Sequence, residues 1–134
     1  MSWKVLIIDD EPAVRNALER ALRYFGYQVV SAAGGDSAYE ILQHDRFDLI
    51  LLDIRMPLMA GDTLFLAIIR RWPELRERTI LMSGDTENIP EGWSPELRSR
   101  PFLAKPFTLD TLRQSLESVL QALARPRPKF GNGA

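Results

Sequence analysis

The sequence predicts an α/β protein built on a single doubly wound, five-stranded parallel sheet. Short, almost wholly apolar runs alternate with longer segments in which apolar residues recur every three to four positions, as in amphipathic helices. The run Leu49–Leu52 is apolar at every position, which is typical of a strand buried on both faces of a parallel sheet. Strands that alternate with helices in this way favour βαβ units, and no internal repeat or second domain is evident.

The length and composition fit one globular domain. The 134 residues are 46% hydrophobic and 26% charged, with a net charge of −1, which points to neither a nucleic-acid nor a membrane partner. Cysteine is absent, so disulfides, thiolate metal sites and cysteine nucleophiles are excluded. No apolar run approaches the ~18 residues that span a bilayer. We expect a cytoplasmic domain over residues 1–124, followed by a flexible tail over residues 125–134.

The first part of the chain predicts three strands and two helices. Residues 5–8 form a strand, and Pro12 lies where a following helix begins, a position that suits a residue without an N–H group. Gly26 ends that helix, and residues 27–32 form the second strand. Asp36 is predicted to be the N-cap of the second helix, which leads to the strand at 49–53.

The second part predicts two more strands. Apolar residues over 64–72 indicate a helix that Pro73 ends, and residues 79–82 form the fourth strand. Three residues interrupt the segment 86–100 (Pro90, Gly92 and Pro95), so a short or irregular helix is expected there. After a short strand over 102–104, Thr108 caps the last helix. Its predicted apolar face comprises Leu109, Leu112, Leu116, Val119, Leu120 and Leu123.

Chemically active side chains follow four of the strands. They are Asp9 and Asp10, Asp53, Ser83, and Lys105. The carboxyl ends of parallel strands meet at one edge, where ligands bind in open α/β sheets. Two like charges ~4 Å apart repel by about 4 kcal/mol at an effective dielectric of 20, so such carboxylates either bind a cation or raise a pKa. Oxygen ligands suit Mg²⁺, and an ammonium and a hydroxyl suit a phosphoryl group. Taken alone, Asp53 could instead simply cap the loop or the next helix.

The ordered set of motifs resembles the receiver domains of two-component response regulators from about Lys4 to Leu123. The matching motifs are Asp9-Asp10, Asp53 with Met56-Pro57 and Gly61, Ser83-Gly84, and Lys105-Pro106-Phe107. The resemblance implies a flavodoxin-like strand order, 2-1-3-4-5. It also implies that Asp53 accepts a phosphoryl group from a phosphohistidine in a Mg²⁺-dependent reaction. Asp10 and Asp53 would bind the ion directly, Asp9 through water, and Arg55 through its backbone carbonyl.

Further roles follow from the same resemblance. Ser83 and Lys105 would each contact a phosphoryl oxygen, and the Lys105-Pro106 bond matches one that is cis in the family. Phe102 lies at the place of the switch aromatic, whose inward turn is coupled to the movement of Ser83. Because phenylalanine has no hydroxyl that prefers water, we expect an inward rotamer to be populated before phosphorylation.

The resemblance implies a signalling domain in a phosphorelay that catalyses only its own phosphorylation and dephosphorylation. Its partners would be a sensor histidine kinase or a phosphotransfer protein and an unidentified downstream protein, with no direct contact to nucleic acid. The domain could be a stand-alone regulator or part of a hybrid histidine kinase. A homodimer is compatible with the sequence, but the proline-broken segment 87–98 weakens the case for dimerisation through the fourth helix.

Other interpretations remain open at this point. Arg55 and Asp85 could pair across the site and hinder the hydrolytic water, or they could be two solvated charges. His44, the only histidine, is expected at the surface, so the phosphodonor is another protein or domain.

A haloacid dehalogenase-type phosphatase also uses an aspartyl phosphate and Mg²⁺, but it needs a second aspartate where this chain has Arg55. A flavin-binding domain of the same topology would have no Mg²⁺ site.

Overall fold

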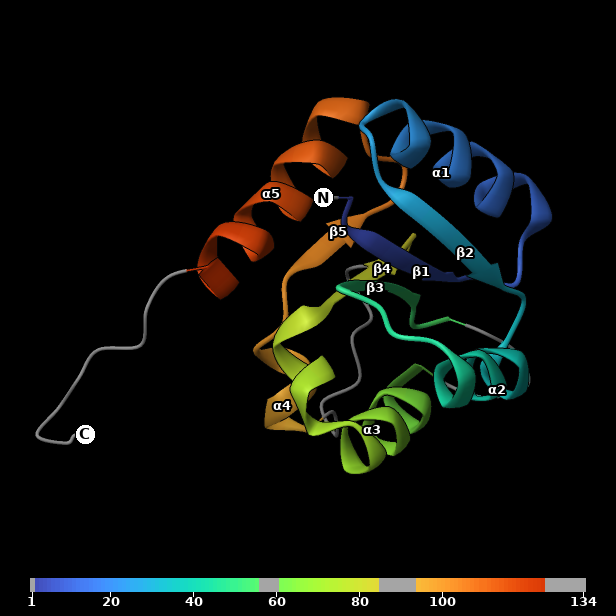
Figure 1. Ribbon diagram of the computed structural model, residues 1–134, viewed down its shortest axis with the longest axis vertical. Helices are drawn as coiled ribbons and strands as arrows, with labels where there is room; N and C mark the ends of the chain where they lie inside the picture. The colour runs from blue at the N-terminus through green and yellow to red at the C-terminus, as the bar shows by residue number, and fades with distance from the viewer. Residues whose placement is uncertain (1, 56–60, 85–93, 125–134) are drawn as a thin grey trace, which may run out of the picture.

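The computed structural model describes residues 2–55, 61–84 and 94–124. The sheet has five parallel strands in the order β2-β1-β3-β4-β5, which confirms the predicted fold class (Figure 1). The strands are β1 (Lys4–Ile8), β2 (Gln28–Ala32), β3 (Leu49–Asp53), β4 (Thr79–Ser83) and β5 (Phe102–Ala104). Within the described ranges, no helix is long and apolar enough to cross a membrane.

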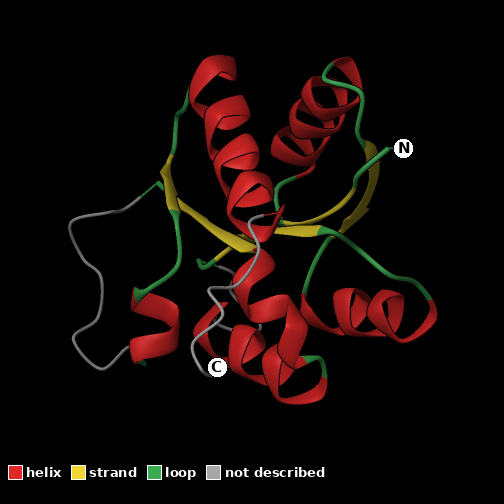
Figure 2. Ribbon diagram, turned by 60° about the vertical axis from the view of Figure 1, so that its left-hand side comes forward, coloured by secondary structure: helices red, strands yellow, loops and turns green. Residues whose placement is uncertain are grey.

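Helices cover both faces of the sheet, as Figure 2 shows. The α-helices are α1 (Pro12–Tyr24), α2 (Gly35–His44), α3 (Gly61–Arg71), α4 (Pro95–Arg98) and α5 (Leu109–Ala124), and a 3₁₀ helix, η1, spans Pro73–Arg78. Helices α1 and α5 lie on one face, whereas α2, α3 and α4 lie on the other (Figure 1). The sheet is therefore the middle layer of three.

Two hydrophobic cores form, one on each face. Alternate residues of the buried strands point to opposite faces, so Leu6 and Ile50 pack with α2, α3 and α4, whereas Ile7 and Leu51 pack with α1 and α5. All five residues of β3 are buried. This explains why that strand is apolar without alternation until its final aspartate.

The register aligns the strand ends on which the site depends. Ile8 of β1 lies opposite Leu52 of β3, and Asp53 lies opposite Met82 of β4. Ser83 in turn lies opposite Ala104 of β5. The residues at the carboxyl ends of β1, β3, β4 and β5 therefore lie side by side along the same end of the sheet.

Two sequence predictions about helix ends were wrong. The N-cap of α2 is Gly34 and the helix begins at Gly35, so Asp36 lies in the first turn instead of capping it. The carbonyl oxygen of Gly34 accepts the Ala38 N–H, which closes the first turn two residues earlier than predicted. Leu109 does not belong to the buried face of α5 but is 59% exposed. Thr108 does cap α5, because its Oγ1 accepts the Thr111 N–H at 3.0 Å.

The connection after α3 contains an element that was not predicted. Pro73 ends α3 but also begins η1, which continues to Arg78. The predicted short helix in the segment 86–100 is the four-residue α4. Met56, Pro57, Asp85, Pro90 and Gly92, together with the predicted tail at 125–134, lie outside the described residues.

Candidate metal and phosphoacceptor site

Four carboxylates meet where β1 and β3 end. Oxygen atoms of Asp9, Asp10, Glu11 and Asp53 all lie within 4.8 Å of one another. Asp9 and Asp53 are buried, Asp10 is half-buried and Glu11 is exposed. The three predicted aspartates are therefore brought together, and Glu11 is an addition that sequence reasoning missed. Its signal was available, since Glu11 directly follows Asp9 and Asp10.

Both carboxylate oxygens of Asp9 are engaged. Oδ1 accepts the Glu11 backbone N–H at 3.0 Å, and Oδ2 lies 2.7 Å from Lys105 Nζ. The Asp9 backbone N–H donates to the carbonyl oxygen of Ala32 in β2 at 3.1 Å. Asp9 is thus held from three sides, as a fully buried carboxylate requires.

Asp53 is held less tightly. Its Oδ1 accepts the Arg55 backbone N–H at 2.9 Å, and its Oδ2 lies 3.4 Å from Lys105 Nζ. Burial raises the pKa of Asp53, and the charge of Asp9 adds to this, whereas the Arg55 N–H and Lys105 reduce the rise. The two contacts of Asp53 therefore do not fully offset the cost of burying its charge, and a nearby cation would lower its pKa.

Lys105 is the positive group of the site. Its backbone N–H donates to the Ser83 carbonyl oxygen at 2.8 Å, which joins the ends of β4 and β5. Burial alone would lower the pKa of Lys105, but its ion pairs with Asp9 and Asp53 outweigh burial and raise it. Lys105 is therefore an ammonium at neutral pH. The Lys105-Pro106 peptide bond is cis, as the resemblance implied.

The remaining predicted residues lie around this centre. Ser83 is the buried last residue of β4, adjacent to the end of β3. Phe102, at the start of β5, is half-buried and packs against the core on the face of α2, α3 and α4. Arg55 is exposed, and its predicted partner Asp85 is not among the described residues. His44 is exposed and lies 3.0 Å from Glu40 Oε1, so it is a surface residue as predicted.

The donor set fits Mg²⁺. Carboxylate oxygens are the ligands that this ion prefers, and it commonly keeps several waters. The half-buried Asp10 and exposed Glu11 leave one side of the cluster accessible to water and to a phosphoryl group. The arrangement can therefore hold a divalent cation beside a buried carboxylate and an ammonium group.

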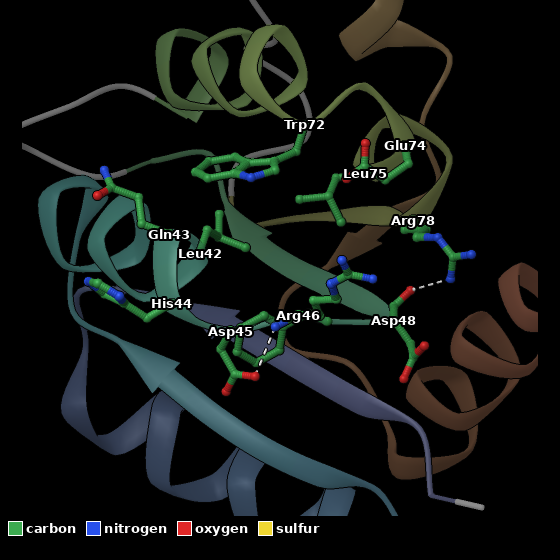
Figure 3. A pocket seen from close by; sticks show the side chains of 11 residues that line it. Leu42, Gln43, His44, Asp45, Arg46, Asp48, Trp72, Glu74, Leu75 and Arg78 are labelled. Carbon is green, nitrogen blue, oxygen red and sulfur yellow. Dashed lines mark hydrogen bonds between the residues drawn. The ribbon is translucent and has the colours of Figure 1, made fainter.

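Two cavities help to locate the site. One of about 720 Å³ lies near the start of β3, between the end of α2 and η1, and its lining includes Arg46, Trp72 and Arg78 (Figure 3). None of the predicted site residues lines it. A second, of about 580 Å³, lies between α1 and α5 and includes Lys105 and Gly84 in its lining. The second cavity is therefore the one that adjoins the carboxylate cluster.

Comparison with known proteins agrees with this geometry. Residues 5–117 match the model of the response regulator receiver domain. Sporulation initiation phosphotransferase F of Bacillus subtilis (strain 168) is 36% identical over 124 residues, which cover 90% of this chain and 95% of that protein. Some relatives are much longer than this chain. The match with the sensor kinase CckA of Brucella abortus (strain 2308), at 34% identity, covers 90% of this chain but 13% of that protein.

Solved structures show the same fold. Chemotaxis protein CheY4 of Vibrio cholerae superposes with a TM-score of 0.76 at 29% identity, covering 89% of this chain and 99% of that one. The receiver domain of the sensor histidine kinase PA1611 from Pseudomonas aeruginosa PAO1, which has a magnesium ion coordinated in its active-site cleft, gives 0.78 at 25% identity, covering 90% and 99%. With its strand order, its acidic edge and a family match over most of its length, this chain belongs to the response regulator receiver domain family.

Proposed function

We propose that Asp53 is a phosphoacceptor that receives a phosphoryl group from the phosphohistidine of a sensor kinase or phosphotransfer protein. The observation that carries this proposal is the placement of the buried Asp53 carboxylate beside Asp9, Asp10 and the Lys105 ammonium. Phosphoryl transfer requires alignment and charge neutralisation more than covalent help from the protein. The strand ends supply the first, and Lys105 supplies part of the second.

Asp10 and Asp53 are the proposed direct ligands of Mg²⁺, with the Arg55 carbonyl oxygen as a third and Asp9 contributing through water. The magnesium ion in the PA1611 receiver domain supports this assignment. When bound, Mg²⁺ supplies positive charge that offsets the carboxylates and the transferring phosphoryl group. Both Asp9 oxygens are already hydrogen-bonded, which agrees with an indirect role.

The remaining steps belong to the side chains around Asp53. The Arg55 N–H fixes one oxygen of the Asp53 carboxylate, while the other attacks phosphorus as the bond from phosphorus to the histidine nitrogen breaks. Lys105 then pairs with one phosphoryl oxygen of the acyl phosphate, and the Ser83 hydroxyl donates to another. The new negative charge draws Ser83 towards it, and Phe102 turns further inward as space opens.

The groove between α1 and α5 is the proposed docking surface for the phosphodonor. Val14, Leu18 and Phe107 make much of its lining apolar, and Leu109 stands 59% exposed at its rim. The groove continues to Lys105, so a helix laid along it would present a histidine to the carboxylate cluster. No observation favours the phosphatase alternative. That class of enzyme needs a second carboxylic acid two positions after the nucleophile, and this chain has Arg55 there.

Intact-mass measurement after incubation with acetyl phosphate and Mg²⁺ tests the proposal. Wild type is expected to gain one phosphoryl group, whereas Asp53→Asn gains none. Asp36→Asn, which removes an exposed carboxylate of α2, is the matched control and should be modified like wild type. Chelation of Mg²⁺ by EDTA should prevent modification. Equal modification of Asp53→Asn and wild type would exclude Asp53 as the acceptor.

A further inference from the structure

The side chain of Arg15 contacts the backbone of the loop that carries Asp9 and Asp10. From the start of α1, its Nη1 donates to the carbonyl oxygen of Asp9 at 2.7 Å. This carbonyl belongs to the peptide unit that joins Asp9 to Asp10. The half-buried guanidinium therefore fixes the plane of that peptide through a charge-assisted hydrogen bond, which is stronger than a neutral one.

Asp10 has no comparable support for its own side chain. In the part of the chain that the structure describes, no hydrogen bond or ion pair holds the Asp10 carboxylate, whereas Asp9 and Asp53 each have two partners. On the other side of Asp10, the Glu11 N–H is held by Asp9 Oδ1 at 3.0 Å. The direction of the Asp10 carboxylate therefore depends on the two peptide units that flank it.

We infer that Arg15 is a positioning residue for Mg²⁺ binding, because it orients the Asp9–Asp10 peptide and thereby aims the Asp10 carboxylate at the position shared with Asp53. This inference rests on the proposed function. Arg15 bonds a neutral carbonyl, so it leaves every carboxylate oxygen of the cluster to other partners. Lys105 differs in this respect, since it occupies oxygens of Asp9 and Asp53.

The charge of Arg15 makes the test decisive. A guanidinium near a cation site repels the cation, so removing it should strengthen Mg²⁺ binding if charge alone mattered. Loss of positioning acts in the opposite direction, because groups that orient metal ligands typically contribute a factor of about 10 to 100 in affinity. The sign of the change therefore separates the two effects.

The experiment is a calorimetric titration of the metal-free protein with MgCl₂ at constant ionic strength. Arg15→Met is expected to weaken Mg²⁺ binding about tenfold, and Arg15→Lys, which keeps a charged donor, should lose less. The control is Arg20→Met, which removes the same charge from an exposed position of α1 and should leave the Kd unchanged. In a parallel assay with acetyl phosphate, the Mg²⁺ concentration for half-maximal rate should rise by the same factor, while the rate at saturating Mg²⁺ is retained.

Unchanged or tighter Mg²⁺ binding by Arg15→Met would overturn the inference. If this variant does not fold by circular dichroism, Arg15→Lys decides the question, with weaker binding in support and wild-type binding against. If wild type itself neither binds Mg²⁺ nor is phosphorylated, the proposed function fails and the inference fails with it. If wild type does both and the Arg15 variants bind Mg²⁺ as wild type does, only the role of Arg15 is excluded.

Discussion

Lys105 Nζ lies 2.7 Å from Asp9 Oδ2, although the two residues are 96 positions apart in the chain. The side chain of Lys105 is 17% exposed and that of Asp9 is fully buried. The pair therefore joins the first and last strands of the site, and it balances a charge that would otherwise be buried without a partner.

Lys105→Met should lower the free energy of unfolding of the metal-free protein by about 3 kcal/mol, because it leaves the Asp9 carboxylate buried without its cation. Urea unfolding in EDTA measures this. Saturating Mg²⁺ should recover more stability in the variant than in wild type, since it supplies the missing charge. The control Lys4→Met breaks a more exposed ion pair with Asp45 and should cost less than about 1 kcal/mol. Equal losses in the two variants would contradict the prediction.

Asp53→Asn should make the metal-free protein more stable at neutral pH. Burial raises the pKa of Asp53 in the folded state above its value in the unfolded state. Below the unfolded-state pKa, protonated Asp53 does not destabilise the fold. As pH rises through the folded-state pKa, the protein loses stability because a buried carboxylate must ionise. The gain in the free energy of unfolding on Asp53→Asn should therefore grow as pH rises from the unfolded-state pKa to the folded-state pKa of Asp53. Urea unfolding in EDTA at several pH values measures it, with the exposed Asp36→Asn as control. An advantage that does not vary with pH would count against the assigned pKa shift.

Arg100→Met should destabilise the fold by about 2–3 kcal/mol. The Arg100 side chain is 8% exposed, and it donates to the carbonyl oxygens of Thr79 and Glu77, both at 3.0 Å. Arg100→Lys should not restore stability, because one ammonium cannot reproduce the geometry of the guanidinium. Thermal unfolding tests both variants. The control Arg113→Met, which removes an exposed ion pair with Asp110, should stay within about 1 kcal/mol of wild type.

Leu109→Ser should slow phosphorylation by a phosphohistidine protein more than phosphorylation by acetyl phosphate. The exposed Leu109 borders the groove beside Lys105, so a protein donor would bury it and a small donor would not. Most interface residues cost less than about 1 kcal/mol when truncated, so we expect the reaction with the protein donor to slow by at most roughly fivefold. Tyr24→Ser, at the far end of α1 and 84% exposed, should affect neither reaction. An equal slowing with both donors would place the effect of Leu109 outside docking.

The fold and the centre of the site could be predicted because their signals are local. Buried strands have apolar sequences, and parallel strands place Asp9, Asp53 and Lys105 at one edge wherever the strands end. The structure between Pro73 and Thr79 was harder to predict, because a proline that ends one helix can also begin another. Pro73 followed by Glu74 was the available signal for η1.

Details that depend on the immediate neighbours of a single residue could not be predicted in the same way. The N-cap of α2 depended on which residue accepts the Ala38 N–H, and both Gly34 and Asp36 suit an N-cap. The bond from Arg15 to the Asp9 carbonyl leaves no residue pattern, since arginine at such a position is equally expected on a solvated face. The exposure of Leu109 reflects its place in the first turn of α5, where none of the described helices and strands covers it.

Strand β5 has only three residues and lies at the edge of the sheet. Phe102 and Lys105 are consequently separated by about 10 Å of extended chain. No loop lies between Lys105 and Phe102, so a displacement of Lys105 is transmitted directly along β5 to the Phe102 side chain. The proposed switch residue therefore lies one short edge strand away from the lysine that is proposed to contact the phosphoryl group.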